Sequence, residues 1–216
     1  MHENDEHTPD GQALKDPTRI LALTDGVFAI IMTLLILEVK IPSANVMILI
    51  EDQLLNTGYR LILYFMSFLL AGVYWVSHRL IFANVKHVNN TLIWLNIIFL
   101  MICSLIPFAA NLLGTFPRDF YALLFYGSLL TLLAAWRLYM YVYVTGRHHL
   151  LIAPVKHVRR RRIIRVMIFA PVMFFLSLCM ISSFPTLSLI LYAITPPCFV
   201  AAITIANRMP VHRQEK

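Results

Sequence analysis

Long apolar runs alternate with short polar segments along this chain of 216 residues. A helix rises about 1.5 Å per residue, so crossing about 30 Å of hydrocarbon takes roughly 20 residues. Runs of that length occur six times, and the segments between them carry proline, asparagine or charge. The pattern predicts an all-α integral membrane protein with six transmembrane helices per subunit. The six spans are approximately residues 19–39, 58–78, 91–113, 120–142, 163–182 and 186–206.

The composition supports this class of protein. Apolar residues make up 59% of the chain and charged residues 13%, whereas an ordinary soluble domain has about 45–50% and about 25%. We therefore expect one six-helix transmembrane domain over residues 19–206, after a polar cytoplasmic segment over 1–18 and before a cytoplasmic tail over 207–216. The first segment is acidic and polar rather than basic and then apolar, so no cleavable signal is expected.

Lysine and arginine are distributed unevenly between the two sides of the predicted bundle. With an even number of spans both termini share a side, and that side carries most of the basic residues, including the run HVRRRRIIR at 157–165. By the positive-inside rule both termini are cytoplasmic, and we expect a multi-pass protein of the plasma or inner cell membrane. The same rule accounts for the basic run and the net charge of +7. Contact with membrane lipid is then a secondary effect, and no nucleic-acid partner is expected.

Several kinds of chemistry are absent from the sequence. The seven glycines are scattered, so there is no phosphate loop, no dinucleotide fingerprint and no TVGYG-type carbonyl filter. The three cysteines lie in separate spans without CxxC spacing, so neither a disulfide framework nor a metal site is expected. No GxSxG or HExxH motif is present, and no second aspartate lies in a mid-membrane position. We predict that the protein is not an enzyme and needs no cofactor.

Asp25 is the only formal charge between Arg19 and Glu38 in the first span. An ionisable group inside a membrane is costly, and it is usually paired or functional. Counted in helical rise from the outer interface, Trp75 and His78 of the second span lie at a similar depth, and Arg19 has a stem long enough to reach upward. We predict that these donors hold the carboxylate and lock the first helix against the second.

One face of the first span is an apolar stripe with a single hydroxyl. At 100° per residue its members fall within about 60° of Arg19, whereas Asp25 lies about 120° away. On pattern alone such a face is typical of ordinary helix packing, and a pore lining is the alternative. The stripe consists of Leu23, Gly26, Ile30, Thr33, Leu34 and Leu37.

Three stretches resemble the transmembrane protein 175 family, the endosomal and lysosomal potassium channels and their prokaryotic relatives. RILALTD at 19–25 is similar to the signature Arg-x-x-x-Phe-Ser-Asp, with Leu23 and Thr24 where the family has Phe and Ser. YWVSHRLIFANVKHVN at 74–89 is similar to the end of the family's second helix, and LIWLNIIFLMICSLIPFAANLLG at 92–114 is similar to its third helix. The resemblance is to the prokaryotic type, which has one six-helix repeat per chain.

The resemblance implies a homotetramer whose first helices line a central pore. The position of Ile30 would form the tightest constriction, and Leu34 and Leu37 would continue this hydrophobic gate. Thr33 matches a threonine implicated in ion selectivity. The implied function is a potassium-selective, leak-type channel with a hydrophobic constriction in place of a carbonyl filter, and potassium as the permeant ion. All four residues lie on the apolar stripe, which favours a pore lining over plain packing.

The predicted role of Asp25 follows from its direction. Because it faces away from the stripe, we interpret it as part of a structural and gating hydrogen-bond network with Arg19, Thr24, Trp75 and His78. A pH-sensing role for His78 is an alternative, since histidine titrates near neutral pH. The alternative function for the whole protein is a proton-coupled secondary transporter that uses Asp25 as the proton carrier.

Overall fold

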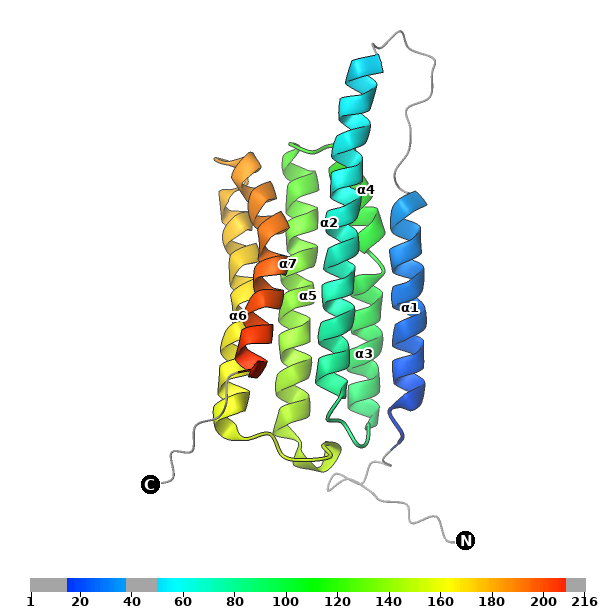
Figure 1. The fold of residues 1–216 in the computed structure, drawn as a ribbon, viewed down its shortest axis with the longest axis vertical. Helices are drawn as coiled ribbons and strands as arrows, with labels where there is room; N and C mark the ends of the chain where they lie inside the picture. The colour runs from blue at the N-terminus through cyan, green and yellow to red at the C-terminus, as the bar shows by residue number, and fades with distance from the viewer. Residues whose placement is uncertain (1–14, 38–49, 209–216) are drawn as a thin grey trace.

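The computed structural model describes residues 15–37 and 50–208. Within these ranges every long element is an α-helix (Figure 1). Six stretches of the described chain are long and apolar enough to cross a membrane. The predicted class, an all-α multi-pass membrane protein with six transmembrane helices, is therefore confirmed. The elements are α1 (Thr18–Leu37), α2 (Ile50–Phe82), α3 (Asn90–Cys103), α4 (Ile106–Thr115), α5 (Phe120–Gly146), the 3-10 helix η1 (His148–Leu150), α6 (His157–Met180) and α7 (Pro185–Arg208).

The helices stand side by side along the long axis of the molecule. Figure 1 places α1 at one side, next to α2 and the α3–α4 pair, and places α6 and α7 at the opposite side. Helix α5 lies between them and packs against α3, α4, α6 and α7. The beginning of α1 and the end of α7 lie at the same end of the bundle. The predicted segments 1–18 and 207–216 lie mostly outside the described residues.

The third predicted span is two helices rather than one. Helix α3 is capped by Asn89, the residue before it, whose side-chain oxygen accepts a hydrogen bond from the Leu92 N–H at 2.9 Å. It ends at Cys103, and α4 begins at Ile106 with Pro107 in its first turn. Proline has no N–H to donate, so it suits the first turn of a helix and not its middle. The break at residues 104–105 follows from this proline.

Two other helices begin earlier than the hydrophobic pattern predicts. Helix α2 begins at Ile50 rather than at 58, and α6 begins at His157 rather than at 163. The basic run 157–165 is therefore helical. Basic residues are good helix formers, so a hydropathy boundary is not a helix boundary.

A short layer of backbone pairing closes the end of the bundle at which α1 begins. Lys15 and Val88 exchange two backbone hydrogen bonds, of 2.9 and 2.8 Å. The Lys86 N–H donates to the Leu150 carbonyl at 2.8 Å, and the Ile152 N–H donates to a carbonyl of the same α2–α3 loop. This layer ties the start of α1 to the loops before α3 and α6.

Among the described residues, the core of the bundle contains one buried Lys or Arg, Arg137 of α5. Its guanidinium lies 4.0 Å from the centre of the Phe199 ring and 5.3 Å from that of Tyr74. It also donates to the Ser77 hydroxyl at 3.2 Å. These contacts join α5 to α2 and α7, and the two aromatic faces supply part of the stabilisation that an anion would otherwise provide.

Candidate functional site: the exposed stripe of α1 and its polar anchors

Helix α1 has a buried face and an exposed face. Ile20, Thr24, Phe28, Ile31 and Leu35 are buried, and they recur every three or four residues, as one side of a helix does. This face packs against α2, α3 and α4.

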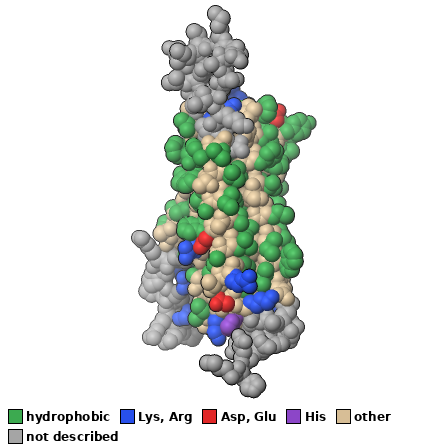
Figure 2. Space-filling view, turned by 90° about the vertical axis from the view of Figure 1, so that its right-hand side faces the viewer, with side chains coloured by type: hydrophobic (Ala, Val, Ile, Leu, Met, Phe, Trp, Pro, Cys, Tyr) green, Lys and Arg blue, Asp and Glu red, His purple; other side chains and the backbone are tan. Residues whose placement is uncertain are grey.

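The apolar stripe found in the sequence lies on the other side of α1. Ile30 is 59% exposed, Leu34 42% and Leu37 68%. Figure 2, which views the molecule from the α1 side, shows hydrophobic side chains over most of its height and Lys and Arg mainly toward the lower end. The subunit therefore leaves the stripe uncovered.

Thr33 is the polar member of this stripe. Its hydroxyl donates within α1, with the carbonyls of Ile30 at 2.9 Å and Ala29 at 3.0 Å as acceptors. The side chain itself is exposed. Because the proton is directed at the backbone, the oxygen keeps lone pairs that a cation or a water molecule can use.

Asp25 is anchored by the second helix. The Trp75 indole N–H donates to its carboxylate at 2.8 Å, and the Arg79 guanidinium lies 5.4 Å from the centre of the Trp75 ring. Asp25 remains exposed. Among the described residues, Arg19 makes no hydrogen bond or ion pair with Asp25. The cation in contact with this anchor is Arg79, one turn after Trp75 on the same face of α2.

A second polar chain runs through the buried space between α1, α2 and α3. His78 Nε2 lies 2.7 Å from the Asn96 side-chain oxygen, and the Asn96 amide donates to the Thr24 hydroxyl at 3.1 Å. That hydroxyl donates in turn to the Ile20 carbonyl at 2.8 Å. Because a carbonyl oxygen only accepts, this order places the His78 proton on Nε2. The chain has one direction from His78 to the backbone of α1.

The surroundings of His78 are apolar. It is 1% exposed, and its ring stacks on Phe82 and Phe99 at centroid distances of 4.4 and 5.6 Å. Its Nδ1 has no hydrogen-bond partner in the described part of the chain.

The structure thus distributes the five predicted network residues over separate places. Asp25 and Trp75 form one pair, Thr24 and His78 belong to the buried chain, and Arg19 joins neither. Sequence reasoning did not assign Asn96 and Arg79 to a site. Asn96 stands in an apolar span, where a polar side chain commonly links helices, and nothing local identifies the helices that its amide joins.

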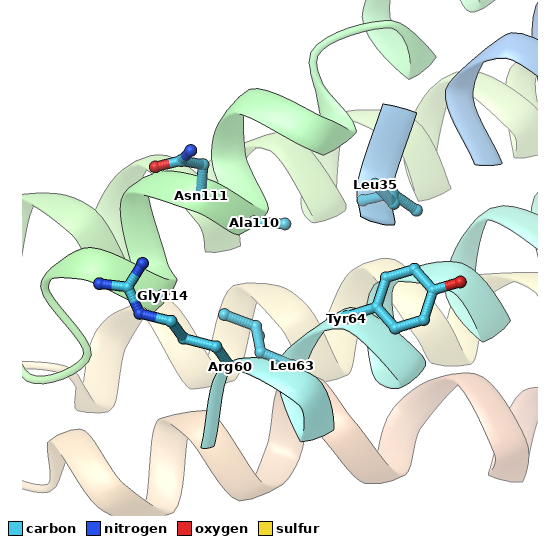
Figure 3. A pocket seen from close by; sticks show the side chains of 7 residues that line it. All are labelled: Leu35, Arg60, Leu63, Tyr64, Ala110, Asn111 and Gly114. Atoms are coloured by element: carbon cyan, nitrogen blue, oxygen red, sulfur yellow. The ribbon is translucent and has the colours of Figure 1, made fainter. Parts of the chain in front are cut away.

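Two hollows border α1. A groove of about 650 Å³ runs beside Asp25 over α2 toward α7, and its lining is almost entirely apolar. Figure 3 shows a smaller cavity between α1, α2 and α4, where Arg60 extends toward α4. That cavity has about 20 Å³, room for roughly one water molecule, so it does not serve as a substrate pocket. In the described part of the chain no three His, Cys, Asp or Glu side chains gather as metal ligands.

Fold and site together define a multi-pass helical membrane protein whose first helix presents an uncovered apolar stripe and is held by polar anchors to its neighbours. Residues 19–107 match the family model described as endosomal/lysosomal potassium channel TMEM175. These residues include α1 and both polar chains. The match identifies this part of the chain as TMEM175-family sequence and confirms the resemblance seen in the sequence.

Curated relatives agree with this assignment. A potassium channel of Chryseobacterium sp. is 37% identical over 97 residues, which are 45% of this chain and 48% of that protein. A potassium channel of Streptomyces collinus is 34% identical over 106 residues, 49% of this chain and 52% of that one. The human endosomal/lysosomal proton channel TMEM175 is 30% identical over 50% of this chain and 21% of its own length. The chain thus spans about half the length of the bacterial relatives it matches. All three are named as channels rather than as enzymes.

A solved structure shares the fold. The crystal structure of a lysosomal potassium-selective channel TMEM175 homolog from Chamaesiphon minutus superimposes with a TM-score of 0.75. The superposition covers 85% of this chain and 96% of that one at 24% identity. It therefore includes helices beyond the sequence match.

Proposed function

We propose that this chain forms a potassium-selective, leak-type ion channel in which four copies surround a central pore lined by α1. The observation that carries the proposal is the exposed stripe: Ile30, Leu34 and Leu37 are uncovered although they belong to a helix with a well-packed opposite face. The names of the bacterial relatives support the choice of ion. Potassium is the permeant ion, and no cofactor takes part.

An apolar neck selects ions by a different route from a carbonyl filter. A cation that passes a ring of four Ile30 side chains meets no oxygen ligand there, so it must carry its water through or shed it. Potassium sheds water more readily than the smaller sodium ion, which gives a modest preference for potassium. The free lone pairs of Thr33, one turn along, steady the partly hydrated ion beyond the neck.

The polar anchors have a structural and gating role in this proposal. Trp75 holds α1 to α2 through Asp25, and Asn96 holds it to α3 through Thr24. Two anchors on different neighbours resist rotation of α1 about its own axis. Rotation would move the stripe away from the pore, so these contacts govern the width and the lining of the neck.

The test is potassium and sodium flux through the purified protein in liposomes. We expect potassium flux to exceed sodium flux, and we expect Ile30→Asn to raise total flux and weaken the preference. Ile36→Asn is the matched control, because Ile36 is 46% exposed on the same helix but lies off the stripe. Equal effects of the two changes would remove Ile30 from the neck. If assembled tetramers show no passive ion flux, the stripe of α1 serves only for helix packing and does not line a pore.

A proton-coupled secondary transporter is the second candidate, because Asp25 is a carboxylate inside the first membrane-spanning helix. A proton-coupled transporter would use Asp25 as its carrier, and its substrate uptake would saturate and require a pH gradient. A channel would pass potassium without any gradient of protons. Measuring flux with and without a pH gradient, in wild type and Asp25→Asn, separates the two functions.

The proposal also includes an orientation. Most Lys and Arg lie at the end of the bundle where α1 begins, and the positive-inside rule then places both termini in the cytoplasm of a cell membrane. Reporter fusions at the two termini, active only on one side of the membrane, test this orientation.

A further inference from the structure

The first turns of α6 contain basic residues of two kinds. Arg160 and Arg162 are used inside the bundle. The Arg160 guanidinium donates to the Thr145 hydroxyl at 2.9 Å and to the Val142 carbonyl at 3.4 Å, and Arg162 donates to the Ala206 carbonyl at 3.4 Å. Both arginines therefore bind the last turns of neighbouring helices, Arg160 that of α5 and Arg162 that of α7.

The other basic residues of this segment point away from the protein. Arg161 and Arg165 are exposed, as are Lys156 and Arg159, and none of them makes a hydrogen bond or ion pair with a described residue. The helices packed against α6 do not balance their charge, because neither α5 nor α7 contains an Asp or Glu.

The local electrostatics are unfavourable without a bound anion. Arg161 and Arg165 are one turn apart, and like charges at this spacing repel. The first turn of α6, which precedes them, has no acidic residue that would offset this repulsion.

An apolar face continues directly from these two arginines. Counted at 100° per residue, Ile168, Val172 and Phe175 fall within about 40° of Arg161 on the helix, as does Arg165. Their exposed fractions are 40%, 56% and 60%. The α6 stripe, which we define as Arg161, Arg165, Ile168, Val172 and Phe175, thus has two charges at the membrane boundary and hydrocarbon-facing side chains farther in.

We propose that the α6 stripe binds an anionic phospholipid, with its phosphate between Arg161 and Arg165 and an acyl chain along Ile168, Val172 and Phe175. The order of charge and apolar surface along the stripe matches the order of headgroup and tail in a lipid. Figure 1 places α6 on the side of the bundle opposite α1, so this surface is separate from the exposed stripe of α1. The proposal does not depend on channel activity.

The experiment compares lipids and variants by native mass spectrometry and thermal unfolding of the purified chain in neutral detergent. The probes are phosphatidylglycerol, phosphatidylcholine of the same acyl chains, and inorganic phosphate. The variant is Arg161→Gln with Arg165→Gln, and the matched control is Lys156→Gln with Arg159→Gln, which removes the same charge off the stripe. Ile168→Ser with Val172→Ser tests the acyl part.

We expect phosphatidylglycerol to be retained and to raise the unfolding temperature of wild type and the control, while the stripe variant binds it at least about tenfold more weakly. The serine variant should lose affinity for both phospholipids. Equal loss in the stripe variant and the control would overturn the proposal, since it would indicate general basicity. Equal stabilisation by phosphatidylcholine or by inorganic phosphate alone would also overturn it.

Discussion

The two sets of hydrogen bonds that hold α1 to its neighbours differ in their exposure. The carboxylate of Asp25 accepts from Trp75 but stays exposed, whereas Asn96 and Thr24 are fully buried. Water or lipid headgroups can replace an exposed hydrogen bond, while a buried group that loses its partner keeps the full cost of desolvation. Residues of the buried chain should therefore matter more for stability than those of the exposed pair.

The exposed pair gives the first prediction at this scale. Trp75→Phe removes the indole N–H and leaves the ring, so we expect a loss of about 1 kcal/mol in unfolding free energy and a small change in flux. Trp94→Phe is the matched control, since Trp94 is 64% exposed. Denaturant unfolding of both variants checks this, and equal losses would contradict a specific role for the Trp75 N–H.

The second prediction concerns the buried hydrogen-bond chain of His78, Asn96 and Thr24. Asn96→Ala leaves the buried His78 N–H without its acceptor and removes the amide that donates to the Thr24 hydroxyl, so we expect a loss of about 2–3 kcal/mol in unfolding free energy. In a double-mutant cycle Asn96→Ala should couple with Thr24→Val and add independently with Trp75→Phe. A coupling energy between Asn96→Ala and Trp75→Phe would mean that the buried and the exposed hydrogen bonds act as a single network.

At the scale of whole helices, α5 and α7 approach closely at Gly127. A Cβ at this position would collide with the Tyr192 hydroxyl and with Leu178 Cδ2. The same hydroxyl lies 3.3 Å from the Leu123 carbonyl and donates to it. Glycine is needed here because the neighbouring ring occupies the space of a side chain.

This contact predicts the effect of one methyl group. We expect Gly127→Ala to lower the unfolding free energy by about 1–3 kcal/mol through overpacking. Tyr192→Phe in the same chain should restore part of the loss, because it removes the colliding oxygen. At Gly58 nothing lies within 4 Å of an added Cβ, so Gly58→Ala should be neutral or slightly stabilising. No rescue by Tyr192→Phe would place the strain elsewhere.

At the scale of the whole molecule, the bundle separates α1 and α6 on opposite sides (Figure 1). In a tetramer built around α1, the α1 helices of the four subunits meet at the axis and the α6 helices face lipid. The two sides should therefore differ in their distance from neighbouring subunits.

Cross-linking tests this arrangement. In a chain whose three cysteines are replaced by alanine, Leu37→Cys should form disulfide-linked dimers on oxidation in the membrane. Val172→Cys, on α6, should not form them. Leu37 and Val172 are 68% and 56% exposed in the subunit, so access of the oxidant does not distinguish them. Dimers through Val172→Cys alone would place α6 at the axis instead.

Several features could be predicted from the chain because they depend on local properties. The number and order of the spans follow from runs of apolar residues, and the apolar stripe of α1 follows from helical periodicity, which by itself favours packing and does not predict the exposure of the stripe. The polar partners could not be predicted in full. Asp25 lies at the right depth for both Trp75 and His78, and only the rotation of α2 decides that Trp75 reaches it while His78 turns to Asn96.

The sequence by itself determined that the chain is a six-span membrane protein, that Ile30, Leu34 and Leu37 share one face of the first span, and which end of the bundle is basic, because hydropathy, helical period and charge are properties of neighbouring residues. Only the tertiary structure decided that the polar residues around α1 form two separate hydrogen-bonded groups. It also decided that α6 uses Arg160 and Arg162 inside the bundle and that Gly127 must lack a side chain. Such outcomes depend on how helices distant in sequence are rotated and spaced against one another, and no local pattern encodes that geometry.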